Sequence, residues 1–177
     1  ISQLQNVIDN SNALILSTGN PYLKQAFSQN IGIRYGRSNT EKATNLFLFA
    51  NAQNTMNYIA NVSTIFTKDT IISDMAVAAG TQLNQPINID GYWNVRTFIT
   101  FGFPITKLKS NMNINGGFVY SRIPTLINSV RNNANSYSLN AGFVFSSNIS
   151  SKIVFTLAYN ANYSFARFMR VSTSFFS

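Results

Sequence analysis

Hydrophobic and polar residues alternate most regularly in the segment from Tyr137 to Phe165. Every second residue is apolar in each of its two arms, which a short polar turn at 147–151 separates. Alternation with a period of two is typical of strands with one apolar and one polar face. Each arm is about twice as long as the five or six residues usual for a soluble strand. That length fits a tilted strand that crosses a bilayer, so the segment is expected to be a membrane hairpin.

The same alternation predicts a meander of six or seven long strands. The expected strands lie at about 26–37, from 44 onward, at 87–103, at 111–121, in the two arms of the hairpin, and at 171–176. The expected connections are short at 38–43, 104–109 and 147–151, and long at 67–85 and 123–135. Transmembrane barrels show this asymmetry, with short periplasmic turns and longer extracellular loops. The fold predicted is therefore all-β, an antiparallel transmembrane β-barrel segment over residues 24–177, with residues 1–23 as a loop or cap leading into it.

The second expected strand, which begins near Thr44, is less regular than the others. Phe47 and Phe49 lie opposite its apolar face. We expect these two rings either to pack inside the barrel at one end or to mark a register change at a β-bulge. Continuation of this strand past the membrane, to about Phe66, is left open by the pattern.

Composition separates this chain from an ordinary soluble domain. Charged residues make up 10%, and aromatic residues 14%, whereas about a quarter of a typical domain is charged. Asn and Ser together form roughly a quarter of the chain, which suits the hydrated lumen of a barrel. The alternative is a soluble, carbohydrate-binding β-sandwich, but its polar face would usually carry many Lys and Glu. A soluble sheet that exposed this many Phe and Tyr would aggregate.

The charge and the missing residue types limit the function. The net charge is +8, but the 13 basic residues are scattered and form no patch typical of nucleic-acid binding. Attraction to anionic lipid headgroups at the rims is the simpler use of this charge. The sequence has no His and no Cys, and only five acidic residues, so no enzyme and no cofactor are expected. Asp69 and Asp74, five residues apart, are expected to be solvated rather than to bind a metal, because calcium needs six to eight oxygens.

No apolar run is long enough for a transmembrane helix, and Ile1 is not followed by a signal peptide. We therefore expect a processed chain, a fragment of a longer one, or a soluble protein.

Two sets of residues follow from the predicted faces. The candidates for the lumen are polar residues in phase with the inner face: Arg34, Asp90, Tyr92, Asn94, Arg96, Asn113, Asn115, Asn140, Asn160 and Asn162. The candidates for the membrane interfaces are aromatic. Tyr35, Phe101, Phe103, Phe145 and Phe155 fall near the short turns, and Trp93, Tyr120, Tyr137 and Tyr163 fall toward the long connections.

Several motifs, in the same order, resemble the barrel region of large TonB-dependent outer-membrane receptors, in the branch known as an outer-membrane β-barrel family. They are G-N-P-Y-L-K at 19–24, P-I-N-I-D-G-Y-W-N at 86–94, G-F-P-I-T-K-L-K at 102–109, and Y-S-R at 120–122 followed by L-I-N at 126–128. The resemblance implies a barrel of about 22 strands in the outer membrane of a Gram-negative bacterium. It also implies a plug, a TonB-contacting segment, and surface lipoproteins as possible partners.

A complete bacterial barrel has an even number of at least eight strands, so six or seven strands are expected to be one part of a larger wall. The remaining strands and the plug would come from the same or another chain. The function expected is substrate import across the outer membrane. The alternative is a barrel scaffold that does not transport and anchors surface or secretion partners.

Overall fold

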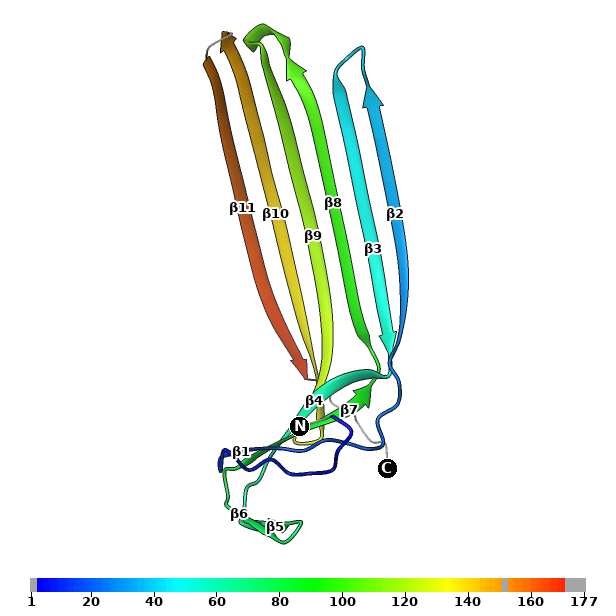
Figure 1. Cartoon of the computed structure of the whole chain (residues 1–177), viewed down its shortest axis with the longest axis vertical. Coiled ribbons are helices and arrows are strands. Elements are labelled where there is room, and N and C mark those ends of the chain that lie inside the picture. Colours follow the sequence, from blue (N-terminus) through cyan, green and yellow to red (C-terminus); the bar gives the residue numbers. More distant parts are fainter. Residues whose placement is uncertain (1–2, 151–152, 171–177) are drawn as a thin grey trace.

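Six long strands form one antiparallel wall in the computed structural model, which describes residues 3–150 and 153–170. They are β2 (Phe27–Asn39), β3 (Thr44–Met56), β8 (Tyr92–Ile105), β9 (Ser110–Ile127), β10 (Val130–Ser150) and β11 (Ile153–Arg170). Each strand pairs with the next in the order β2-β3-β8-β9-β10-β11 (Figure 1). The wall confirms the predicted all-β antiparallel fold, and it does not close, because β2 pairs only with β3 and β11 only with β10 among the described residues. The seventh strand expected at 171–176 lies outside the described residues.

The β2–β3 and β8–β9 connections lie at one end of the wall, which we call the turn end, and β10 ends and β11 begins at the same end (Figure 1). Residues 40–43 join β2 to β3. A single 3₁₀ turn, η1 (Thr106–Leu108), joins β8 to β9, and Lys109 closes it in the left-handed conformation with φ 45°. The third short connection expected, between β10 and β11, falls at residues 151–152, outside the described residues. Among the described residues, no helix is both long and apolar enough to span a membrane.

The long connection expected at 123–135 is wrong. β9 continues to Ile127 and β10 begins at Val130, so only Asn128 and Ser129 connect them. Both have positive φ, 49° and 64°, as in the type I′ turns that suit the twist of a two-residue hairpin. The alternation fades here because the hairpin tip packs against a further part of the chain, so neither of its faces has to be apolar.

The strand expected at 87–103 is also wrong, because it consists of two strands. β7 (Gln82–Ile89) ends before Asp90 and Gly91, and β8 starts afterwards. Gly91 has φ 104°, a conformation that side chains with a Cβ rarely adopt, so the chain changes direction there. The second expected strand likewise stops at Met56, and Asn57, with φ 50°, separates it from β4 (Tyr58–Ile65).

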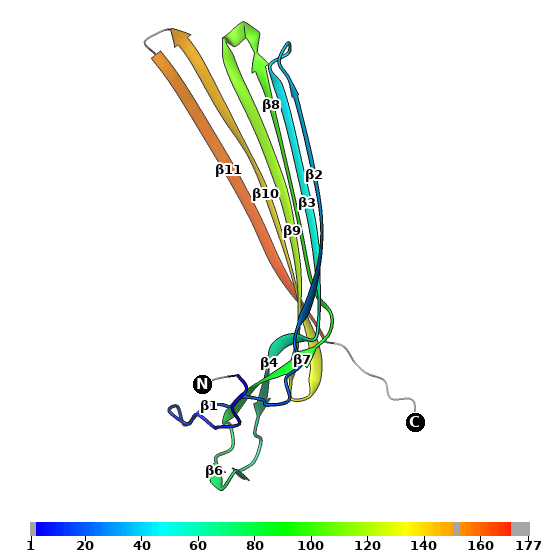
Figure 2. The same ribbon diagram turned by 45° about the vertical axis from the view of Figure 1, so that its right-hand side comes forward.

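The connection between β3 and β8 therefore forms a separate structure beyond the wall, which we call the extension (residues 57–91; Figure 2). β4 pairs antiparallel with β7, which also pairs in parallel with β1 (Ile15–Ser17). A small hairpin, β5 (Thr70–Ile72) and β6 (Met75–Val77), projects furthest from the wall (Figure 1).

Polar contacts tie the extension to the wall. The hairpin tip of β9 and β10 reaches β4, where the Asn128 N–H donates to the Ser63 carbonyl at 3.1 Å. The Thr125 hydroxyl donates to the Asn61 carbonyl at 3.2 Å. On the other side, the Asp90 carboxylate accepts the Asn57 N–H at 2.7 Å, which fixes the junction between β3 and β4.

The N-terminal segment lies along the extension before it enters the wall. The Asn20 amide donates to the Pro86 carbonyl at 3.0 Å. The Asn88 side chain forms two hydrogen bonds with the backbone of Lys24, at 2.6 and 2.9 Å. Further back, the hydroxyl and backbone N–H of Ser11 donate to Asp9 and lower the pKa of that carboxyl.

Candidate functional site: the two faces of the wall

The register of the six strands brings like residues together on each face. Cross-strand partners share a face of a sheet, so the pairing carries one face from β2 through to β11. One row, for example, joins Ile31, Ala52, Val95, Tyr120, Tyr137 and Phe165. We call this the outward face, because it is apolar, and the opposite one the polar face.

All the aromatic residues predicted for the membrane interfaces lie on the outward face. At the end opposite the turns, which we call the loop end, the rings of Tyr120 and Tyr137 lie 5.1 Å apart, and those of Tyr137 and Phe165 lie 4.7 Å apart. At the turn end, the rings of Phe101 and Phe103 stack at 5.4 Å. Aromatic pairs at these distances add about 0.5–1.5 kcal/mol each beyond their burial.

The polar face carries all the residues predicted for the lumen except Asp90. The register places Arg34, Tyr92, Asn94, Arg96, Asn113, Asn115, Asn140, Asn160 and Asn162 there. Asp90 lies instead in the turn between β7 and β8, where it holds Asn57. Asp90 and Arg96 are an even number of residues apart, which in one continuous strand would put them on the same face. The chain bends at Gly91 between them, so this spacing does not apply.

The polar face contains the two phenylalanines for which the alternation left two possibilities, together with a third, Phe98. Phe47 and Phe49 of β3 lie there beside Phe98 of β8. β3 pairs with β2 and β8 without a register shift, so the expected β-bulge is wrong and the alternative holds: both rings are on the inner side. The Arg34 guanidinium lies 5.6 Å from the centre of the Phe49 ring, within cation–π range.

Asparagines lie directly over glycines on the polar face, a feature that single strands could not show. Each such glycine has an Asn opposite it on a neighbouring strand, and the Asn side chain lies against the position that a Cβ would take. The pairs are Asn51 with Gly32, Asn45 and Asn113 with Gly102, Asn140 with Gly117, and Asn115 and Asn160 with Gly142. The result is a dense layer of amide groups against the sheet.

Hydroxyl and amide groups complete this surface. The Ser138 and Ser164 hydroxyls are 2.9 Å apart, and those of Ser28 and Thr55 are 2.8 Å apart. Arg96 donates from Nε to the Asn94 amide oxygen at 2.9 Å. Such groups hold water and neutral polar solutes well but carry out no proton transfer near neutral pH.

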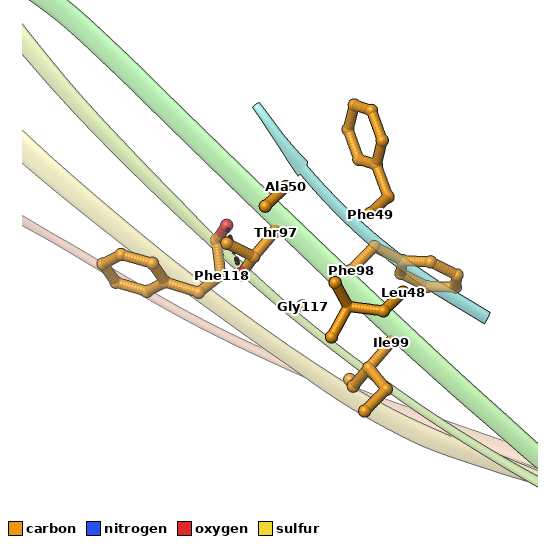
Figure 3. Close-up of a pocket in the computed structure, with 9 residues that line it drawn as sticks. Leu48, Phe49, Ala50, Thr97, Phe98, Ile99, Gly117 and Phe118 are labelled. Carbon is orange, nitrogen blue, oxygen red and sulfur yellow. Dashed lines mark hydrogen bonds between the residues drawn. The ribbon is translucent and has the colours of Figure 1, made fainter. Parts of the chain in front are cut away.

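An apolar hollow of the wall opens on the outward face (Figure 3). It lies over Gly116, between the larger side chains of Leu48, Ile99 and Phe118. Its one side-chain hydroxyl, that of Thr97, lies 3.5 Å from the Phe118 carbonyl (Figure 3). An apolar hollow of this kind has the chemistry to accept a hydrocarbon chain.

The acidic pair considered for a metal has structural roles in its loop. Asp69 accepts the Ala79 N–H at 2.8 Å, and Asp74 has φ 65° in the turn between β5 and β6. Within the described parts of the chain, 3–150 and 153–170, His, Cys, Asp and Glu form no group of three that could hold a metal ion.

Comparison with known proteins agrees with this two-faced wall. The model of the outer membrane protein beta-barrel family matches residues 1–177. The chain belongs to this family. No curated protein and no solved structure matches it. Membership in the outer membrane protein beta-barrel family places the chain in the outer membrane of a Gram-negative bacterium, as predicted.

The apolar band of the outward face crosses the strands obliquely, as expected for a barrel of this family. The hydrogen-bonded row through Tyr35 reaches Ala161, and apolar residues on β11 continue beyond it to Phe155 at the turn end. At the loop end the band stops at Phe165 on β11. On β2 it continues further, to Phe27, and is interrupted there only by Gln29. Strands of closed barrels tilt by about 35–45° from the barrel axis. The rows of paired residues run across the strands and are therefore tilted by the same angle from the membrane plane. An apolar band parallel to the membrane then crosses these rows obliquely.

The assignment of the two faces can be tested with neighbouring cysteines. Ser138 and Leu139 are adjacent on β10 but lie on opposite faces, and the chain has no native Cys. In native outer-membrane vesicles we expect Ser138→Cys to react about tenfold faster with a water-soluble maleimide than Leu139→Cys, because the thiolate forms only in water. Equal labelling of the two variants would mean that the outward face is not in lipid.

Proposed function

We propose that this chain is part of the barrel wall of a TonB-dependent receptor that imports a substrate across the outer membrane. The observation that carries the proposal is the six-stranded wall, whose two edges have no partner within residues 3–150 and 153–170, together with its amide-rich polar face. Exposed strand edges in a membrane must be paired, so further strands are required on both sides. A barrel with many strands encloses a lumen wide enough for a plug.

The sequence motifs that resemble these receptors support the proposal, because each lies at a junction of the fold. Residues 19–24 lead along β7 towards β2, and residues 86–94 contain the bend between β7 and β8. Residues 102–109 form the end of β8 and η1, and residues 120–128 run along β9 to the hairpin tip. The motifs thus coincide with the places where the chain enters the wall, bends or turns back.

In this role the polar face meets a plug or a hydrated substrate path. The amides over glycines offer donors and acceptors without charge, and Arg34 with Phe49 offers a cation beside an aromatic ring. Energy coupling lies outside these residues, in a plug and a TonB-contacting segment, and surface lipoproteins are further partners at the loop end. The chain has no catalytic role and needs no cofactor in this proposal.

The test uses the full-length polypeptide that carries this chain, purified from outer membranes. We expect an intact mass several times that of 177 residues, and binding of the purified periplasmic domain of TonB in calorimetry. A peptide with the sequence of the TonB-contacting segment should compete for that binding. A polypeptide that has no plug and binds no TonB would refute import and favour the alternative, a scaffold that does not transport.

A further inference from the structure

Positive charge gathers on the outward face at the loop end, one step beyond the aromatic residues. Tyr120, Tyr137 and Phe165 share one row, and the next row contains Arg122, Asn135 and Arg167. Asn133 and Arg131 follow on the same face of β10. We call Arg122, Arg131, Asn133, Asn135 and Arg167 the arginine patch.

No carboxylate from the same strands neutralises this charge. The five acidic residues of the chain are Asp9, Glu41, Asp69, Asp74 and Asp90. All of them precede β8, so residues 91–177 contain eight of the 13 basic residues and no acid, and hold the whole net charge of +8. The patch therefore has an excess of positive charge without an internal counter-ion on β8 to β11.

The patch also contains hydrogen-bonding atoms without a partner. Among the described residues, the two buried side-chain atoms that lack a hydrogen bond are Arg122 Nε and Asn133 Oδ1. Their neighbours are already engaged: Asn135 accepts the Tyr120 hydroxyl at 3.0 Å, and Arg131 donates to the Asp90 carbonyl. The Arg122 guanidinium thus has no partner for its buried Nε within the described residues, while the half-buried side chain keeps part of its surface open to a ligand from outside.

We propose that the arginine patch binds the phosphate group of an anionic lipid in the leaflet at the loop end. The patch continues directly from the apolar band, so a molecule whose hydrocarbon part lies on that band can place its headgroup over the patch. Tyr120 and Tyr137 lie at the depth where aromatic rings meet headgroups. Guanidinium groups bind phosphate through several N–H donors at once.

The only tryptophan of the chain reports on this site. Trp93 lies on the outward face directly opposite Arg122 in the register, and its side chain is 41% exposed. A lipid that carries bromine atoms near its headgroup quenches tryptophan fluorescence at short range. The signal of Trp93 is the difference between the full-length polypeptide and its Trp93→Phe variant, both reconstituted in vesicles.

The experiment compares phosphatidylcholine vesicles that contain the same minor fraction of either brominated phosphatidylglycerol or brominated phosphatidylcholine. We expect quenching of Trp93 to be about twofold or more stronger with the anionic lipid, because one arginine near an anionic surface enriches such lipids about fivefold. In the double variant Arg122→Gln/Arg167→Gln the two lipids should quench equally. The matched control, Arg34→Gln/Arg96→Gln, removes the same charge from the polar face and should keep the preference.

Two results would overturn the proposal. One is equal quenching by the two lipids in the unaltered protein. The other is a preference that the Arg122→Gln/Arg167→Gln variant retains. If that variant does not fold, native mass spectrometry of the unaltered protein from mixed vesicles decides, since it should retain phosphatidylglycerol over phosphatidylcholine about fivefold; no such retention refutes the site.

Discussion

Replacing Gly142 by alanine is expected to destabilise the barrel by about 1–3 kcal/mol, the usual cost of forcing an extra carbon into a packed site. Gly142 is buried on β10, where the side chains of Asn115 and Asn160 lie over it. An added Cβ would also meet the carbonyl oxygen of Tyr159 at 2.7 Å. That oxygen belongs to the backbone of β11 and cannot move away without disturbing the pairing of the two strands. The measurement is the urea concentration at the midpoint of unfolding of the reconstituted full-length polypeptide. Folded and unfolded protein are distinguished by their different migration in a gel without heating.

Gly36→Ala is the matched control for this prediction. Gly36 also lies within a wall strand, β2, but nothing is within 4 Å of the position that its Cβ would take. We expect a change within about 0.5 kcal/mol, as for most exposed substitutions. If both variants lose the same stability, the cause is the general loss of glycine and not the crowding around Gly142 by Asn115, Asn160 and the Tyr159 carbonyl.

The two faces of the wall could be predicted from the sequence because the membrane constrains every second residue. A shift of one residue would move all side chains of a strand to the other face. This is why single-strand alternation was enough to put Tyr35, Trp93 and Asn140 on the faces that the register gives them. The alternation also predicted the short connections at the turn end, because each of them is a short polar stretch between two alternating segments.

Beyond the loop end the same reasoning had nothing to detect. The tip of β9 and β10 is a regular hairpin, but Thr125 and Asn128 bond to Asn61 and Ser63 of the extension, more than 60 residues away in the sequence. Strand structure there is set by polar contacts and not by an apolar face. Asp90 was misplaced for the same reason, since the bend at Gly91 follows from φ 104° and not from any change in the alternation.

The layer of asparagines over glycines required the register as well as the faces. Asn115 and Asn160 come from the two strands on either side of Gly142. They lie at different distances from Gly142 along the sequence, so no repeated spacing reveals the contact. The composition indicated many Asn residues for a hydrated lumen. Only the pairing shows that several of them serve to pack the sheet, so that the amides of this surface are positioned before any solute arrives.

An arginine in the middle of the outward face is expected to have the largest effect on stability. Ala161 lies on β11 between Phe155 and Phe165, near the centre of the apolar band. Ala161→Arg should cost about 2–4 kcal/mol, the penalty for a basic residue at the bilayer midplane on the lipid-facing side of a barrel strand. The next residue, Asn162, faces the opposite way towards Asn140, so Asn162→Arg adds the same side chain on the polar face and should change stability by less than about 1 kcal/mol. Both variants are compared by urea unfolding of the full-length polypeptide in vesicles of one lipid composition. Equal losses would show that β11 does not present its apolar side to lipid, whereas a loss confined to Ala161→Arg places the membrane on that side.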